Sequence, residues 1–123
     1  MRGLIFLFSF LVLSSALAQP APPPPPLNAP RPAGAPHSCL SYYPPAEAQA
    51  HVEGRTLVAF TIKTDGTVTD VSVARSSGNS DLDNAAMTCV KTWLYRPVLQ
   101  NGQAVELPWK AFVNWQIVPG APN

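Results

Sequence analysis

The sequence has little net charge, which limits the kinds of partner it can attract. Its 123 residues include eight basic and seven acidic residues, for a formal net charge of +1. Removal of Arg2 with a cleaved N-terminus would leave seven of each. A neutral domain has no electrostatic attraction for nucleic acid or for anionic lipid, so neither is expected as a partner.

The sequence also has few of the side chains that carry out catalysis. His37 and His51 are its two histidines and lie apart, and the acidic residues fall in expected turns and at an expected helix start. An active site needs a nucleophile with a base, paired carboxylates or a metal cluster. We therefore predict no enzymatic activity, no cofactor and no metal site. His51 is expected at the end of a short helix, in the left-handed conformation that histidine tolerates.

A long apolar run is lacking, apart from a short one at the N-terminus. Residues 1–18 resemble a secretory signal peptide, with Arg2, an apolar stretch at 4–13 and a small-residue cleavage site ending at Ala18. A membrane-spanning helix needs about 20 apolar residues, and serines interrupt this one. We expect cleavage between Ala18 and Gln19 and a periplasmic protein. The alternative is an uncleaved anchor in the inner membrane.

Cysteine is scarce as well: the sequence contains Cys39 and Cys89 alone. In an oxidising compartment such a pair is expected to form a disulfide. It would close a loop of about 50 residues, worth roughly 4 kcal/mol in the chain-entropy treatment. The alternative is a redox or metal pair that includes His37, although no CxxC spacing supports it.

Composition divides the chain into four parts. After the signal peptide at 1–18, residues 19–38 form a leader rich in proline and alanine, which is expected to be extended and disordered. Residues 39–119 contain the apolar periodicity of a folded domain, and 120–123 are a short tail.

The folded part begins with a short helix at 46–50, followed by two strands. Residues 55–64 alternate apolar and polar side chains, Asp65-Gly66 predicts a tight turn, and 67–75 continue the hairpin. These strands are expected to be half buried.

A longer helix follows, capped by Asn79 or Ser80 and ended before Pro97. One apolar stripe is expected on it, made of Leu82, Ala85, Ala86, Cys89, Val90 and Trp93.

Asn101-Gly102 then predicts a hairpin turn. The last strand is expected at 104–118, with Trp109 and Trp115 in the core and Pro108 at an edge.

Antiparallel strands with helices on one face make an α+β two-layer sandwich. Several short motifs, in one order from about residue 43 to 118, resemble the C-terminal domain of TonB-type energy transducers. They are Tyr43-Pro44, Gly54, Asp65-Gly66-Thr67-Val68, Ser76-Ser77-Gly78-Asn79, Leu82-Asp83, Ala85-Ala86, Trp93, Pro97 and Asn101-Gly102. The resemblance implies two helices on one face of a three-stranded antiparallel sheet.

The resemblance also implies a binding function in TonB-dependent transport. A domain of this family captures an extended segment of an outer-membrane receptor, the TonB box, as an added strand. The expected contacts on the last strand are Phe112, Asn114, Gln116 and Val118. The partner could instead be another periplasmic protein, or a second copy of the chain in a homodimer. The alternative function is a short transducer anchored in the inner membrane and coupled to ExbB/ExbD.

Overall fold

The computed structural model describes Gly3, Pro20 and residues 29–117. Ala18, Gln19 and Val118, which the sequence analysis singled out, lie outside the described residues. The elements in chain order are β1 (Pro32–Ala33), a 3-10 helix η1 (Leu40–Tyr42), α1 (Pro45–Gln49), β2 (Gly54–Ile62), β3 (Val68–Arg75), α2 (Ser80–Val90), β4 (Leu94–Tyr95), β5 (Val98–Gln100), β6 (Gln103–Val105) and β7 (Leu107–Trp115).

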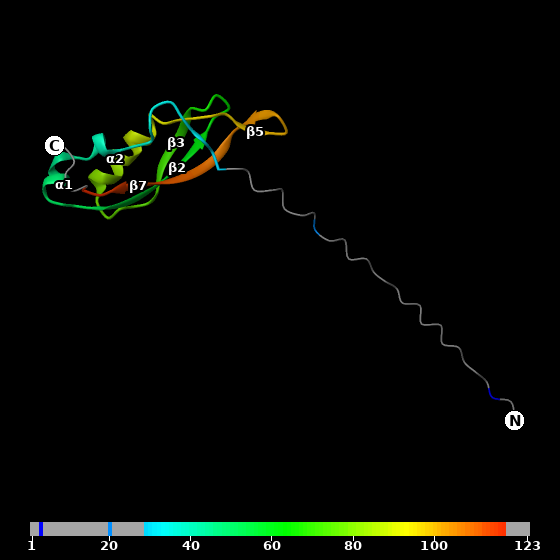
Figure 1. The fold of residues 1–123 in the computed structure, drawn as a ribbon. Coiled ribbons are helices and arrows are strands. Elements are labelled where there is room, and N and C mark those ends of the chain that lie inside the picture. The colour runs from blue at the N-terminus through cyan, green and yellow to red at the C-terminus, as the bar shows by residue number, and fades with distance from the viewer. Residues whose placement is uncertain (1–2, 4–19, 21–28, 118–123) are drawn as a thin grey trace.

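The main sheet has three antiparallel strands in the order β3-β2-β7. Helix α2 lies across one face of this sheet, against β2 and β3 (Figure 1). Two small antiparallel pairs, β1 with β4 and β5 with β6, stand beside it. The α+β prediction, with helices packed on a three-stranded antiparallel sheet, is confirmed.

The core lies between α2 and the main sheet, as the sequence periodicity predicts. Val58, Phe60 and Ile62 point from β2 toward the helix and are buried, because alternate side chains of a strand share a face. They belong to one cluster with the buried residues of α2, which are Leu82, Ala86, Cys89 and Val90. At the other end of the sheet the Tyr43 ring packs edge-on against Trp115, with 5.2 Å between ring centroids.

The helix start and two turns follow their local sequences. Asn79 caps α2, and its side chain accepts a hydrogen bond of 3.0 Å from the Leu82 amide. Asn101 and Gly102 both have positive φ, and so does His51 after α1. Gly66, with φ +86, could not be replaced, because a Cβ atom there would lie 2.0 Å from the Tyr95 carbonyl oxygen.

Helix α2 is shorter than predicted. It ends at Val90, well before Pro97, so Trp93 is not part of its apolar stripe. The Thr92 hydroxyl donates a 2.7 Å hydrogen bond to the Cys89 carbonyl, and the chain turns there. Trp93 is nevertheless buried, because the turn directs it into the core.

The predicted last strand at 104–118 is divided in two at Glu106. Gln103–Val105 forms β6 and pairs with β5, while β7 runs from Leu107 to Trp115 and pairs with β2. The prediction of two core tryptophans is half correct, because Trp115 is fully buried and Trp109 is 37% exposed. Trp109 lies opposite Phe60 on the edge strand, and the rings of Trp93 and Tyr95 pack on Phe60.

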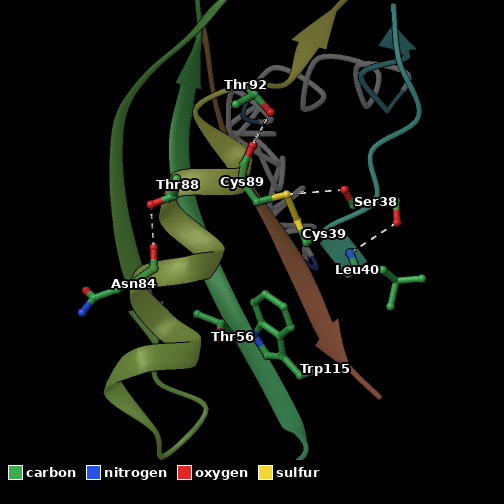
Figure 2. Close-up of a disulfide and its surroundings, with 9 residues drawn as sticks. All are labelled: Ser38, Cys39, Leu40, Thr56, Asn84, Thr88, Cys89, Thr92 and Trp115. Carbon is green, nitrogen blue, oxygen red and sulfur yellow. Dashed lines mark hydrogen bonds between the residues drawn. A yellow bond between two sulfur atoms is a disulfide. The ribbon is translucent and has the colours of Figure 1, made fainter. Parts of the chain in front are cut away.

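A buried carboxylate joins the helix to the sheet. Asp83 of α2 accepts hydrogen bonds from the Thr56 hydroxyl at 2.9 Å, from the Ser77 amide at 2.9 Å and from the Ser77 hydroxyl at 2.7 Å. The Ser76 hydroxyl also donates to it. The Trp115 indole in turn donates to the Thr56 hydroxyl at 3.2 Å, and both side chains are visible side by side in Figure 2. This network connects β7, β2, α2 and the turn after β3.

These donors control the ionisation of Asp83. Burial raises the pKa of its carboxyl group, but the hydrogen bonds from Ser76, Ser77 and Thr56 together outweigh burial and hold the pKa below its ordinary value. The folded protein therefore favours the ionised form of Asp83.

Cys39 and Cys89 form the predicted disulfide, with their Cα atoms 5.7 Å apart (Figure 2). It ties the segment before α1 to the C-terminal turn of α2. The Cys89 sulfur also lies 3.6 Å from the Ser38 carbonyl oxygen. This approach is a packing contact, because a sulfur atom in a disulfide carries no proton to donate.

Removal of the disulfide should markedly lower the stability of this small domain. The cross-link spans 50 residues, so its loss should reduce the free energy of unfolding by about 4 kcal/mol. Thermal unfolding with and without a thiol reductant measures the effect. The Cys39→Ser, Cys89→Ser double variant is the control, and its melting temperature should not respond to reductant. An unchanged melting temperature in the reduced parent protein would contradict the prediction.

Replacing Asp83 with asparagine should destabilise the protein at neutral pH by about 2 kcal/mol, because buried donors lose a charged acceptor. The unfolded aspartate has a pKa of about 3.9. The folded pKa is lower, so the stabilisation is present above about pH 4 and is lost as the pH falls through the folded value.

Urea unfolding at several pH values measures the effect of the Asp83 substitution. The difference between parent and Asp83→Asn should shrink in acid. Asp70→Asn is the matched control, since Asp70 is an exposed aspartate whose left-handed backbone also suits asparagine. A difference that does not depend on pH would contradict the role of the ionised carboxylate.

Candidate functional site

The main sheet leaves one regular strand edge open. Strand β2 pairs with β7 from Gly54 opposite Trp115 to Ile62 opposite Leu107, with no register shift. The other edge of β7 pairs with no strand among the residues that the structure describes. An open edge presents backbone amide and carbonyl groups that can bind another extended chain.

The opposite edge of the sheet, on β3, is irregular. Its pairing with β2 shifts register at two places, and Asp70 adopts a φ of +53 at one of them. Bulges of this kind, together with charged side chains, protect a strand edge from pairing with another chain. Strand β7 is therefore the better site for an added strand.

Pro108 shows which residues of β7 direct their backbone groups outward. Residues of an antiparallel strand alternate between bonding to one neighbour and bonding to the other. Proline has no amide hydrogen to donate to a neighbouring strand, so in a sheet its nitrogen usually faces the free edge. Because Pro108 lies opposite Thr61 in an unbroken register, Lys110, Phe112 and Asn114 also direct their amides and carbonyls away from β2.

Two of the predicted contact residues thus lie on the free edge, as the alternation requires. Phe112 is 42% exposed and Asn114 is exposed. The Arg55 guanidinium lies over the Phe112 ring, 4.4 Å from its centroid, on the sheet face opposite α2. Gln116 is exposed but follows the end of β7, and Val118 lies outside the described residues.

Sequence reasoning placed Pro108 at a strand edge, but it named neither Pro108 nor Lys110 among the contact residues of this edge. Both share the period of two that selected Phe112 and Asn114, so the signal was present in the alternation. They also line a shallow hollow of about 520 Å³ on the sheet face, together with Ala59, Phe60, Thr61, Asp70 and Trp109.

A second hollow lies beside the other half of β7. It measures about 200 Å³ and is lined by Phe112, Val113 and Asn114, by residues 37–40 and by Trp93. Since no residue of β2 lines it, this hollow is on the free-edge side of β7.

The two histidines lie in structural surroundings. The His37 ring stacks on Trp93 at 4.4 Å, and its Nε2 donates a 2.7 Å hydrogen bond to the Leu94 carbonyl. His51 is exposed at the end of α1. Within residues 29–117, no three acidic, histidine or cysteine side chains gather as metal ligands, and no helix has the length and apolarity to cross a membrane. What the site presents is a row of backbone hydrogen-bonding groups.

Comparison with known proteins identifies the domain. The family profile described as Gram-negative bacterial TonB protein C-terminal matches residues 40–117. The chain is 43% identical over 61 residues to Protein TonB of Xanthomonas campestris pv. campestris (strain B100), a match that covers 50% of this chain and 27% of that protein. It is 40% identical over 55 residues to Protein TonB of Helicobacter pylori (strain J99), covering 45% of this chain and 20% of that protein.

Two solved structures have the same fold. The TonB C-terminal domain of Pseudomonas aeruginosa, solved by NMR, matches with a TM-score of 0.50 and 29% identity, over 60% of this chain and 76% of that chain. The TonB2 protein of Vibrio anguillarum matches with a TM-score of 0.50 and 30% identity, over 62% and 73% of the two chains.

These matches confirm the family expected from the sequence motifs. They also confirm the prediction that the chain is not an enzyme, because TonB proteins are energy transducers. The C-terminal domain of TonB is periplasmic. The matched region spans no more than 27% of the length of these two relatives. The chain therefore belongs to the TonB C-terminal domain family.

Proposed function

We propose that this domain binds an extended segment of an outer-membrane receptor in TonB-dependent transport, by adding that segment as a strand to the free edge of β7. The observation that carries the proposal is the unbroken register between β2 and β7, which leaves the second edge of a nine-residue strand open. Family membership supplies the class of partner. In this mode the backbone provides affinity, and alternate side chains provide selectivity.

The amides of Lys110 and Phe112 and the carbonyl of Pro108 provide regularly spaced hydrogen-bonding groups for such a segment. Selectivity would come from the side chains on the outer sheet face. Phe112, supported by the Arg55 guanidinium, offers an apolar surface there, and Lys110 offers a positive charge. A segment with an apolar residue opposite Phe112 fits this surface.

We further propose that the domain acts in the periplasm after cleavage between Ala18 and Gln19. The support is the sequence of residues 1–18, which has the charge, apolar stretch and small-residue site of a signal peptide. Retention of this segment would instead give a short anchored transducer.

A proline at position 110 should weaken strand addition while the domain stays folded. The Lys110 amide points away from β2, so Lys110→Pro removes a donor to the partner and none within the sheet. Lys110→Ala removes the charged side chain alone. We expect Lys110→Pro to bind about tenfold more weakly than Lys110→Ala, because backbone hydrogen bonds are lost. Titration with a synthetic peptide copied from the N-terminal segment of a TonB-dependent receptor measures the difference.

Ala111→Pro is the matched control for this experiment. The Ala111 amide bonds to β2, so the same substitution one residue later should unfold the domain, as seen by circular dichroism. Equal binding by Lys110→Pro and Lys110→Ala would refute strand addition at β7. The same comparison applies to self-association, because two copies pairing through β7 would use the same amide.

Cell fractionation and N-terminal sequencing test the proposed location. We expect a soluble periplasmic protein that begins at Gln19. A membrane-bound protein that retains Met1 would refute the cleaved form and favour the anchored transducer.

A further inference from the structure

The segment Arg31–Leu40, here called the strap, is held against the domain at four places. Its strand β1 pairs with β4, and the Arg31 carbonyl accepts a 2.9 Å hydrogen bond from the Arg96 amide. His37 stacks on Trp93, and Cys39 is bonded to Cys89. Most of this segment was expected to be a disordered leader, since it is rich in proline and alanine. Composition of this kind carries no information about pairing with distant segments.

The strap runs along part of the free edge of β7. Its residues 37–40 and the β7 residues Phe112, Val113 and Asn114 line the two sides of the 200 Å³ hollow. Figure 2 shows Cys39 and Leu40 on the side of β7 away from β2. The hollow around Pro108 and Lys110, by contrast, has no strap residue in its lining.

The position of the strap decides what can pair with this half of β7. A strand added to a sheet edge lies in the plane of the sheet, about 4.8 Å from its neighbour. Residues 37–40 line the hollow beside Phe112, Val113 and Asn114 on the free-edge side, so a strand added along these residues would meet the strap.

We propose that the strap is a built-in competitor for the C-terminal half of the β7 edge, held in place by the Cys39–Cys89 disulfide. An incoming peptide strand pairs with Pro108–Ala111, and it reaches Phe112 and Asn114 only when the strap is displaced. The inference rests on the proposed strand addition at β7. It adds that the disulfide sets the length of edge that is available, and hence the affinity.

The exposure of the edge amides tests the strap without any ligand. A soluble nitroxide broadens the NMR signals of amides that it can approach. In the disulfide-bonded protein, we expect broadening at Lys110 and protection at Phe112 and Asn114. In the Cys39→Ser, Cys89→Ser variant all three amides should broaden alike. Equal broadening in the disulfide-bonded protein would overturn the proposal.

Peptide binding gives the second test, with the receptor-derived peptide as probe. The shifted amides in the disulfide-bonded protein should lie within Leu107–Ala111 and extend to Asn114 in the double variant, with about tenfold tighter binding. Shifts that reach Asn114 in both proteins would overturn the strap proposal and leave strand addition standing. If no β7 amide shifts in either protein, strand addition itself fails, whatever the nitroxide shows.

A second variant covers the case in which the double variant does not fold. His37→Ala keeps the disulfide but removes the stack on Trp93 and the hydrogen bond to Leu94. It should increase the nitroxide broadening at Phe112 and Asn114 to a level between those of the disulfide-bonded protein and the double variant. The Trp115 indole signal monitors the fold in each protein, since its donor is hydrogen-bonded in the core. No change at Phe112 and Asn114 in the folded His37→Ala protein would also overturn the proposal.

Discussion

The buried carboxylate of Asp83 is the constraint on which the arrangement of this domain depends. It accepts hydrogen bonds from β2, through Thr56, and from the turn after β3, through Ser76 and Ser77. Thr56 in turn accepts from Trp115 of β7. Because a buried charge is costly unless it is fully hydrogen-bonded, the helix start can take few positions on the sheet. The same network therefore sets the position of β7 in the sheet.

The two edges of the sheet differ in a way that suits a single binding strand. Edge β3 has irregular pairing and Asp70 in a left-handed conformation, whereas β7 pairs with β2 without a shift. Pro108 weakens only one end of β7, since its missing amide faces outward. An open and regular edge is also prone to unwanted pairing, and the strap covers half of it. The disulfide therefore stabilises a small core and limits the exposed edge at the same time.

Much of the fold could be predicted from the sequence, because the responsible rules act over a few residues. The alternation in β2, the Asn79 cap and the turn at Asn101-Gly102 were all recognised from local sequence. The placement of Phe112 and Asn114 on the free edge follows from the same alternation. The disulfide was predicted because the sequence contains one pair of cysteines.

Other features depend on which segments meet in the folded chain. The end of α2 at Val90 and the exposure of Trp109 follow from the pairing of β4 and β7 with distant partners. At Glu106 the chain passes from the local hairpin of β5 and β6 to the pairing of β7 with β2. The strap shows this most clearly. Its proline-rich sequence predicts an extended chain, but it does not predict that this chain pairs with β4. The sequence by itself thus determined the elements and the residues on each strand face. Only the tertiary structure decided which part of the β7 edge stays open, because that depends on contacts between residues more than 50 positions apart.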